Sequence, residues 1–283
     1  MARPLRLEIA GAVYLISAHC PYDRGLPAFA DAADHDAWRA LLAQALLRFD
    51  AQALAYVLLP DHFHLLLFTR RANLSLLMRH MNGVYTQHHQ RRHGGSGALF
   101  QGRFHAVLVD REHHLLDSCR YLDLNPVRLG LVPTAADWPA SSFRALAALE
   151  PAPDWLDAAG LHAHLLQRPA RTAAQQRQAG ARYARLVAAD PGFQLWPGRL
   201  REQIFLGDAR FAARMRALAA APGGTPPQAA GFDAWLQQAD GIREQALWLA
   251  HTQGGVPMSD LARQLGLSVS RISRLIAAAE RAL

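Results

Sequence analysis

Residues 55–68 read AYVLLPDHFHLLLF. Two apolar runs flank a Pro-Asp pair, which predicts two β-strands, at about residues 53–59 and 62–68, joined by a tight turn. Because side chains alternate between the two faces of a strand, His62 and His64 would point to one side of the sheet and the phenylalanine between them to the other. Two imidazoles side by side on a rigid strand would form half of a metal site, so this tripeptide constrains function more than any other part of the chain.

The segments around this stretch predict the order strand, helix, strand, strand, helix, strand, followed by one more helix. The other predicted elements are a strand at 12–17, a helix from Asp36 to Phe49, a helix capped by Asn73 that stops before Gly94, a strand at 104–109, and a helix capped by Asp110 that ends at Asn125 and Pro126. This order predicts an α+β fold with a ferredoxin-like (split βαβ) antiparallel sheet and helices.

Beyond residue 149 the sequence predicts an all-α C-terminal region. Residues 150–220 are rich in arginine and alanine and predict a helical extension, for example in the stretch RLREQIFL at 199–206. Residues 221–232 contain APGGTPP and predict a linker, and residues 233–283 predict a small helical module. The expected division is therefore 1–149, 150–220, the linker, and 233–283.

The chain is basic, with 30 Lys+Arg, all of them arginine, against 23 Asp+Glu, a net charge of +7 and a pI of about 10.2. Arginine binds phosphate bidentately and stacks on bases, so nucleic acid is the first partner to test. The abundant alanine also fits a compositional habit of the source genome, which would favour arginine without any nucleic-acid partner.

Cysteine usage and apolar patterning predict a cytoplasmic protein that does not insert into membranes. Cys20 and Cys119 are the two cysteines, far apart and without metal-ligand spacing, which excludes a disulfide framework and fits a reducing compartment. No apolar run is long enough to span a bilayer.

The helix that Asp110 caps carries two groups that could complete the histidine pair. Tyr121 and Asn125 are one helical turn apart and would stand together on one face. A divalent ion held by His62, His64 and the Asn125 side-chain oxygen would polarise a phosphodiester. Tyr121 would then attack phosphorus and form a covalent protein–DNA ester.

Each of these groups also has a purely structural interpretation. An isolated His-x-His in a strand is more often structural than catalytic, Tyr121 could be an ordinary residue at a helix edge, and Asn125 could simply precede a proline at a helix end. A hydrolytic binuclear metal site usually has an Asp-His pair after its His-x-His. Here three leucines follow, which argues against such a site.

A basic segment, HHQRRH at 88–93, ends the helix that Asn73 caps and precedes a glycine-rich stretch. Its Arg91 and Arg92, together with Arg79 and Arg103, are candidates for contacts with DNA phosphates. The alternative is a solvated helix end in which cations are favoured by the helix dipole.

Residues 259–275 read SDLARQLGLSVSRISRL and resemble a helix-turn-helix. Ala262 is the small residue that allows close helix approach, and Gly266 would make the turn. Four polar side chains would then face DNA: Ser268, Ser270, Arg271 and Arg274. A plain helical hairpin is the alternative.

Several stretches together resemble the REP-associated tyrosine transposases, an insertion-sequence branch of the single-tyrosine HUH transposases. They are MARPLR at 1–6 with GAVY at 11–14, YVLLPDHFHLLL at 56–67, LFQGRF at 99–104 and RYLDLNPVR at 120–128. The resemblance covers about residues 1–145 closely and extends more weakly through 200–207 in longer members.

The resemblance implies that residues 1–149 form an HUH catalytic domain. By it, His62, His64 and Asn125 are ligands of Mg²⁺ or Mn²⁺, and Tyr121 is the nucleophile that forms a 5′-phosphotyrosine link. The implied partner is single-stranded or hairpin DNA with palindromic repeats. The sequence leaves open whether the chain acts as a monomer or as a homodimer. The implied activity is transposition by cutting and rejoining DNA next to hairpins.

Some positions depart from the family pattern. Asp61 stands where relatives usually have Asn, His105 stands at an expected DNA contact where many have Lys, and Ala18-His19-Cys20 replaces a common Arg-Gly-Asn. The alternative function is a catalytically decayed, domesticated DNA-binding regulator of repetitive palindromic elements. A relaxase or replication initiator would use the same chemistry.

Overall fold

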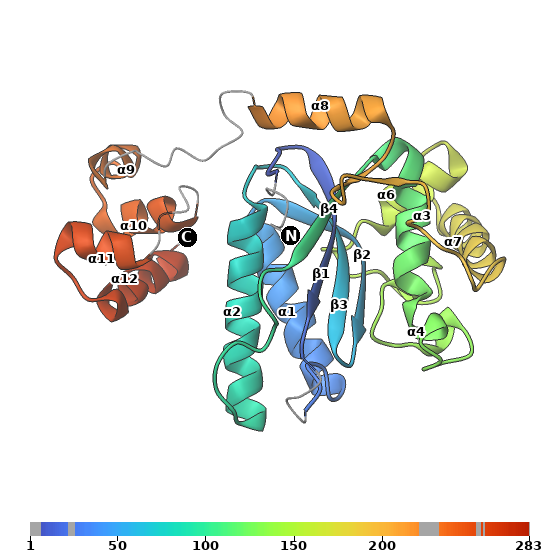
Figure 1. The fold of residues 1–283 in the computed structure, drawn as a ribbon, viewed down its shortest axis with the longest axis horizontal. Coiled ribbons are helices and arrows are strands. Elements are labelled where there is room, and N and C mark those ends of the chain that lie inside the picture. The colour runs from blue at the N-terminus through green and yellow to red at the C-terminus, as the bar shows by residue number, and fades with distance from the viewer. Residues whose placement is uncertain (1–6, 22–25, 221–231, 253–255, 257, 283) are drawn as a thin grey trace.

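The computed structural model describes residues 7–21, 26–220, 232–252, 256 and 258–282. The expected linker lies outside the described residues except for Phe232, and so does the matching segment at 1–6. The structure is a mixed α+β fold, which confirms the predicted class (Figure 1).

A six-stranded sheet runs in the order β2-β3-β1-β4-β6-β5. Its first four strands by sequence are β1 (Ala12–His19), β2 (Ala51–Leu59), β3 (His62–Thr69) and β4 (His105–Val109). All three pairings among these strands, β1 with β3, β1 with β4 and β2 with β3, are antiparallel. The predicted strands are therefore present, with β1 and β2 each two residues longer than expected and β4 beginning one residue later.

Helices lie on both faces of the sheet (Figure 1). Helices α1 (Ala32–Arg48) and α2 (Leu74–His93) cover one face and α3 (Arg111–Asp123) covers the other. The two neighbouring side chains of β3 show the layering: the ring of Phe63 lies 5.1 Å from Trp38 of α1, and the ring of His64 lies 5.9 Å from Tyr121 of α3. The sheet thus separates an apolar layer from the layer that holds the histidines.

Two helix starts differ from the predictions in detail. Helix α1 begins at Ala32, before the expected Asp36, because the Asp31 carboxylate accepts from the backbone N–H groups of Ala33 and Asp34 and caps the helix there. Asn73 does stand at the N-cap of α2, but its side chain makes no capping bond. Its amide instead donates to the Phe49 carbonyl, 2.9 Å away, and ties the start of α2 to the end of α1.

Helix α3 is capped by Asp110 as predicted, since its carboxylate accepts from the Glu112 N–H. Helix α3 ends at Asp123, directly before the predicted stop at Asn125 and Pro126. Asn125 then begins a second short helix that was not predicted, α4 (Asn125–Arg128). Pro126 fits the first turn of α4 because a helix needs no N–H donor there.

The prediction that residues 150–220 are entirely helical is wrong at one place. Helices α6 (Ala158–Leu166), α7 (Ala173–Ala188) and α8 (Ala209–Ala220) are present, but β5 (Leu200–Arg201) and β6 (Phe205–Leu206) form a hairpin. Glu202 and Gln203 turn this hairpin with positive φ, and β6 pairs in parallel with β4. Edge pairing and burial of Phe205 and Leu206 therefore override the local helical pattern.

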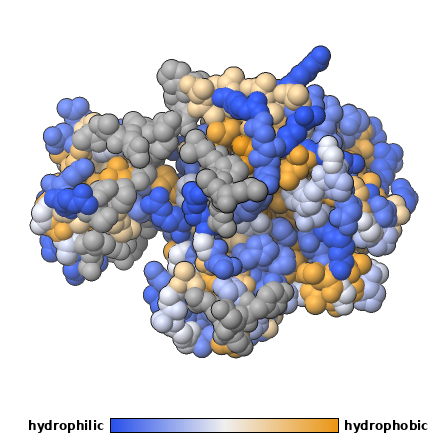
Figure 2. All heavy atoms as spheres, viewed as in Figure 1, coloured by the Kyte–Doolittle hydropathy of each residue, from blue (hydrophilic) through white to orange (hydrophobic). Residues whose placement is uncertain are grey.

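The remaining helices are short or C-terminal. They are the 3-10 helix η2 (Ala135–Asp137), α5 (Phe143–Leu146), α9 (Phe232–Gln238), α10 (Arg243–Thr252), α11 (Met258–Leu265) and α12 (Val269–Ala282). Among the described residues, no helix combines the length and the apolar character needed to cross a membrane. Hydrophilic side chains are spread over much of the face seen in Figure 2.

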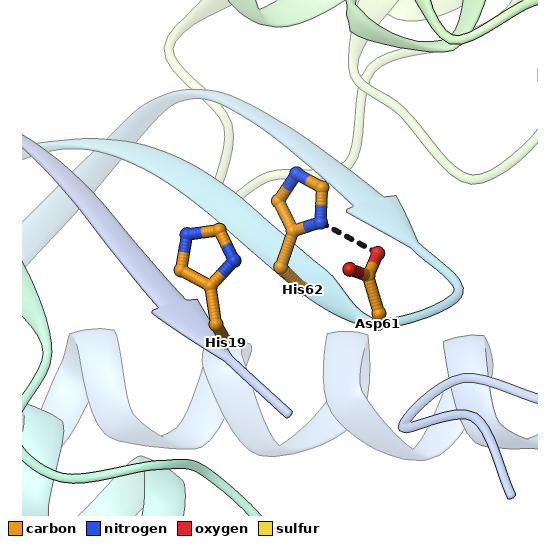
Figure 3. Close-up of side chains that lie close together, drawn as sticks. All are labelled: His19, Asp61 and His62. Atoms are coloured by element: carbon orange, nitrogen blue, oxygen red, sulfur yellow. Dashed lines mark hydrogen bonds and ion pairs between the residues drawn. The ribbon is translucent and has the colours of Figure 1, made fainter. Parts of the chain in front are cut away.

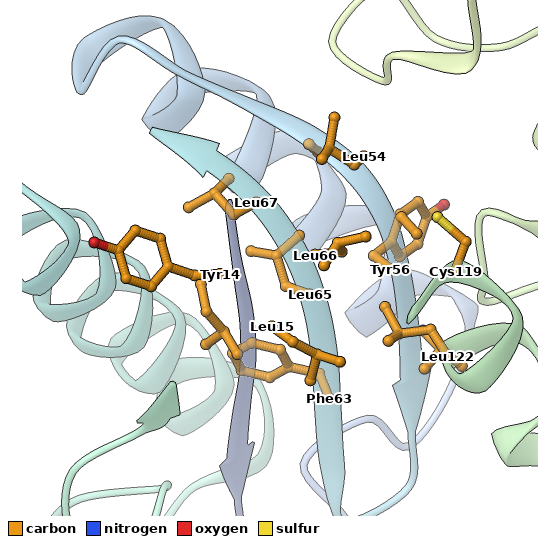
Figure 4. Close-up of a cluster of buried hydrophobic side chains, with 14 of the residues drawn as sticks. Tyr14, Leu15, Leu54, Tyr56, Phe63, Leu65, Leu66, Leu67, Cys119 and Leu122 are labelled. Atoms are coloured by element: carbon orange, nitrogen blue, oxygen red, sulfur yellow. The ribbon is translucent and has the colours of Figure 1, made fainter. Parts of the chain in front are cut away.

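The buried side chains form two separate hydrophobic clusters. The larger is centred on the sheet, where Leu15, Phe63 and Leu65 are almost fully buried (Figure 4), and it extends to Met215 of α8. Residues 150–220 thus share one core with the sheet. The smaller cluster joins α9 to α12 and includes Trp235.

A buried carboxyl group ties α3 to its neighbours. Asp123, at the last turn of α3, accepts from the Tyr183 hydroxyl at 2.5 Å and from the Ser142 hydroxyl at 3.3 Å. Ser142 also bonds to the backbone of Tyr56 in β2. This network holds α3 against α7 and the sheet, and burial raises the pKa of Asp123 to about 7.

We expect Asp123→Asn to make the free energy of unfolding less sensitive to pH. Because the folded pKa exceeds the unfolded value of about 3.9, the native state holds the proton more tightly, and this stabilisation is lost as pH rises through 7. The variant should gain stability relative to the parent between about pH 4 and pH 8, by on the order of 4 kcal/mol. Urea unfolding across this range measures the gain, and parallel curves would contradict the assignment.

Candidate active site

Three histidines from two neighbouring strands face the α3 side of the sheet. His62 and His64 share a face as predicted, are 9% and 8% exposed, and have ring centroids 5.1 Å apart. His19 ends β1 directly opposite His62, and the two rings stack at 4.6 Å with an interplanar angle of 18° (Figure 3). We refer to His19, His62 and His64 as the histidine cluster.

Asp61 orients one member of this cluster. Its Oδ1 lies 2.7 Å from His62 Nδ1 (Figure 3). Since an ionised carboxylate only accepts hydrogen bonds, Nδ1 is the donor in this contact, and Nε2 is the nitrogen directed away from Asp61 that could bind a metal ion. This is the arrangement by which a carboxylate prepares an imidazole to bind a metal ion.

His64 is the most deeply enclosed member. Within the described residues its Nδ1 is buried without a hydrogen-bond partner. Burial lowers the pKa of His64 well below its ordinary value, and the neighbouring His62 and His19 lower it further. The ring is therefore neutral near pH 7, the state in which an imidazole nitrogen can act as a ligand.

Tyr121 approaches the cluster from α3, with its ring centroid 5.9 Å from that of His64. The Tyr121 ring is itself held from two sides. The Trp196 ring lies 5.2 Å away, and the Arg128 guanidinium carbon lies 4.3 Å over the ring centroid while Nη2 donates to the Tyr121 carbonyl at 2.8 Å. The tyrosine is thus fixed next to the histidines.

Asn125 is buried at the start of α4, one turn beyond Tyr121. Its Nδ2 donates to the Tyr121 carbonyl at 3.0 Å, which fixes the orientation of the amide. The structure therefore brings Tyr121 together with His64 and places Asn125 against the backbone of the tyrosine. The assignment of Asn125 as a metal ligand stays a prediction.

Sequence reasoning missed several parts of this site. His19 and Asp61 were noted only as departures from the family pattern, and Arg128 and Trp196 were given no role. The proximity of His19 to His62 depends on the register between β1 and β3, which no local pattern reveals. Asp61 directly precedes His62, so its role was visible in the sequence as a carboxylate beside a candidate ligand.

The predicted DNA contacts fall into different surroundings. Arg103 and His105 are exposed and line a cavity of about 340 Å³ together with Gln101 and His19. This cavity therefore adjoins the histidine cluster. His105 stands opposite Ser17, in the same row across the sheet as His64.

The three candidate arginines of α2 differ in their surroundings. Arg79 and Arg91 are exposed. Arg92, in contrast, is held at 2.5 Å by each of the carboxylates of Asp31 and Asp34, so it stabilises the start of α1. We therefore leave Arg92 out of the proposed DNA contacts.

The C-terminal candidates lie at the start of α12. Ser268, Arg271 and Arg274 are exposed, and the Ser268 hydroxyl accepts from the Arg271 N–H at 3.2 Å. Gly266 turns the chain between α11 and α12 with a φ of 63°. The side chain of Ser270 lies outside the described residues.

Comparison with known proteins finds a relative by sequence. A protein of Haemophilus influenzae named as a REP-associated tyrosine transposase is 28% identical over 118 residues, which cover 38% of this chain and 66% of the relative, just under two thirds. A solved structure of a REP-associated tyrosine transposase bound to a REP hairpin has a TM-score of 0.46 and 22% identity, over 56% of this chain and 94% of that one. No family model matches the chain. The sequence relative confirms the resemblance found in the motifs.

We expect His64→Gln to reduce the loss of stability on acidification. The folded pKa of His64 lies below its unfolded value, so the unfolded state takes up the proton first and the native state loses stability as pH falls below about 6.5. Between about pH 7.5 and pH 5, the metal-free variant should lose on the order of 1 kcal/mol less than the parent in urea unfolding. An equal loss in both proteins would show that His64 does not titrate as its burial requires.

Proposed function

We propose that this chain, which is similar in sequence to a REP-associated tyrosine transposase, is a metal-dependent enzyme that cleaves and rejoins single-stranded DNA next to hairpins. Tyr121 would be its nucleophile, and the intermediate a 5′-phosphotyrosine link. The observation that carries the proposal is the meeting of Tyr121 with the histidine cluster, 5.9 Å from His64, since these groups come from two separate parts of the chain.

The donor groups fit a divalent metal ion. The unpartnered Nδ1 of His64 and the Asp61-oriented ring of His62 are the kinds of nitrogen that metal sites use, and the buried amide of Asn125 offers an oxygen. In the proposed site these three residues hold Mg²⁺ or Mn²⁺. When bound, the ion would polarise the scissile phosphate and offset its developing negative charge.

The protein's own residues would carry out the transfer. The Tyr121 hydroxyl oxygen would form a bond to phosphorus while the bond from phosphorus to the 3′ oxygen breaks. The phenolic proton would pass to a neighbouring base or to water, and the leaving 3′ oxygen would take up a proton from water. The products are a 5′-phosphotyrosine and a free 3′ hydroxyl. Attack by a 3′ hydroxyl on this ester reverses the step, so one site both cuts and rejoins.

The sheet suits this chemistry as a rigid support. The strand order β2-β3-β1-β4, with antiparallel neighbours, supports the ferredoxin-like assignment of residues 1–149 as an HUH catalytic domain. The cavity lined by Arg103 and His105 lies beside the cluster and offers a cationic group and an imidazole for single-stranded DNA. Arg79 and Arg91 would add phosphate contacts along α2.

Helices α11 and α12 are proposed to form a helix-turn-helix. Ala262 and Ile272 are buried between them and the Leu267 N–H donates to the Ala262 carbonyl at 2.9 Å, so the helices are closely packed at the turn. Arg271 and Arg274 are exposed on α12, the helix that would enter a DNA groove. Residues 233–283 would then be a second DNA-binding module.

The decisive experiment is a covalent-adduct assay. The full chain is mixed with hairpin oligonucleotides taken from inverted repeats that flank its gene, with Mg²⁺ or Mn²⁺, and resolved on a denaturing gel. We expect an adduct with the parent protein and none with Tyr121→Phe or after chelation, because both the hydroxyl and the ion are needed.

Tyr85→Phe serves as the matched control, since its hydroxyl donates to the Ala28 carbonyl on the α2 side of the sheet, away from the cluster. It should still form the adduct if it folds, as checked by circular dichroism. An adduct with Tyr121→Phe would refute the assigned nucleophile. Metal-independent DNA binding without any adduct would favour a decayed regulator.

The double variant Arg271→Ala, Arg274→Ala should weaken binding to duplex DNA and leave adduct formation on short single strands unchanged. Loss of two phosphate contacts should lower the slope of log affinity against log salt by about 2. Fluorescence anisotropy at several salt concentrations measures this slope, and an unchanged slope would favour a plain helical hairpin.

A further inference from the structure

We propose that His19 is a third imidazole ligand of this metal site and makes it prefer a transition-metal ion over Mg²⁺. The inference rests on the proposed function, because it concerns the same site. It adds His19 of β1 to the ligands His62 and His64 of β3, and it says which class of metal ion these three imidazoles would bind best.

The backbone holds His19 firmly at the site. His19 is the last residue of β1 and pairs with His62 in the β1–β3 register. Its carbonyl accepts from the Gln101 N–H at 2.7 Å, and the next residue, Cys20, donates from its N–H to the Asp61 carbonyl at 2.6 Å. The imidazole therefore stands on a fixed strand end beside the turn that carries Asp61.

The ligand atoms of His19 lie close to those of the neighbouring residues Asp61 and His62. One ligand atom each from His19, Asp61 and His62 lies within 4.8 Å of the others. The ring centroid of His19 is 6.4 Å from that of His64, and the His62 ring lies 5.1 Å from the His64 ring. The centroids of the three imidazole rings thus lie within 6.4 Å of one another.

A second observation points to a ligand beside these rings. His64 Nδ1 is buried without a hydrogen-bond partner among the described residues, on a side chain more than nine-tenths buried. An unpaired buried nitrogen costs roughly 1–3 kcal/mol, and coordination to an ion would recover this. Simple ring stacking between His19 and His62 leaves the orphaned nitrogen unexplained.

The ligand set determines the ion. Mg²⁺ takes oxygen ligands in near-octahedral geometry and loses its water reluctantly, whereas imidazole nitrogen favours first-row transition metals. A site with His62, His64 and one amide oxygen could serve either class of ion. Adding His19 gives three nitrogens and shifts the preference toward ions such as Co²⁺.

The test uses the full chain freed of metal by chelation and then titrated with Co²⁺ or Mg²⁺ in a calorimeter. Visible absorption of bound Co²⁺ reports its ligands directly. His19→Phe is the informative variant, because it keeps a ring to stack on His62 and removes both nitrogens. His113→Ala is the matched control, since this exposed histidine on α3 pairs with Asp110 instead.

We expect the parent to bind Co²⁺ more tightly than Mg²⁺. His19→Phe should weaken Co²⁺ binding by at least about tenfold and change its visible spectrum, with little effect on Mg²⁺, while His113→Ala matches the parent. Equal affinities for the two ions in the parent would overturn the proposal. If His19→Phe keeps the Co²⁺ affinity and the spectrum of the parent, His19 is not a ligand and serves only in packing.

His62→Ala separates this inference from the proposed function. If His62→Ala abolishes Co²⁺ binding and His19→Phe leaves it unchanged, the metal site stands and the role of His19 is refuted. If neither variant affects Co²⁺ binding, the metal site of the proposed function fails together with this inference.

Discussion

The site depends on the register of the antiparallel pairing between β1 and β3. This pairing sets His62 opposite His19 and His64 opposite Ser17. Because side chains alternate along a strand, a slip of one residue would turn both histidines of β3 into the apolar layer under α1 and α2. Phe63 prevents such a slip, since it is fully buried against Trp38 and Phe100 on that side.

Tyr121 is placed by a second, independent constraint. The Asp123 carboxyl joins α3 to α7 and, through Ser142, to β2, while Arg128 binds the Tyr121 carbonyl and covers its ring. The tyrosine is therefore positioned by a buried polar network and the histidines by strand pairing. The short distance between them results from two parts of the fold that are each specified separately.

Local patterns in the sequence predicted the parts of the structure that depend on local physics. Alternation and helical spacing gave the strands and helices around residues 12–123, and the shared face of His62 and His64 followed from strand geometry. Contacts between residues far apart in the sequence could not be predicted from such local patterns. The β5–β6 hairpin forms because Phe205 and Leu206 pair with the edge of β4, and His19 joins the cluster only through its register with His62.

The proposed mechanism requires that Tyr121, and no other tyrosine, becomes joined to DNA. The chain contains six tyrosines, so the position of the link can be tested. The most direct measurement is peptide mass spectrometry of the trapped protein–DNA complex after digestion with protease and nuclease. The account predicts a nucleotide 5′-phosphate on the peptide containing Tyr121 and on no other. A nucleotide on a different tyrosine, or a complex without a phosphotyrosine bond, would contradict it.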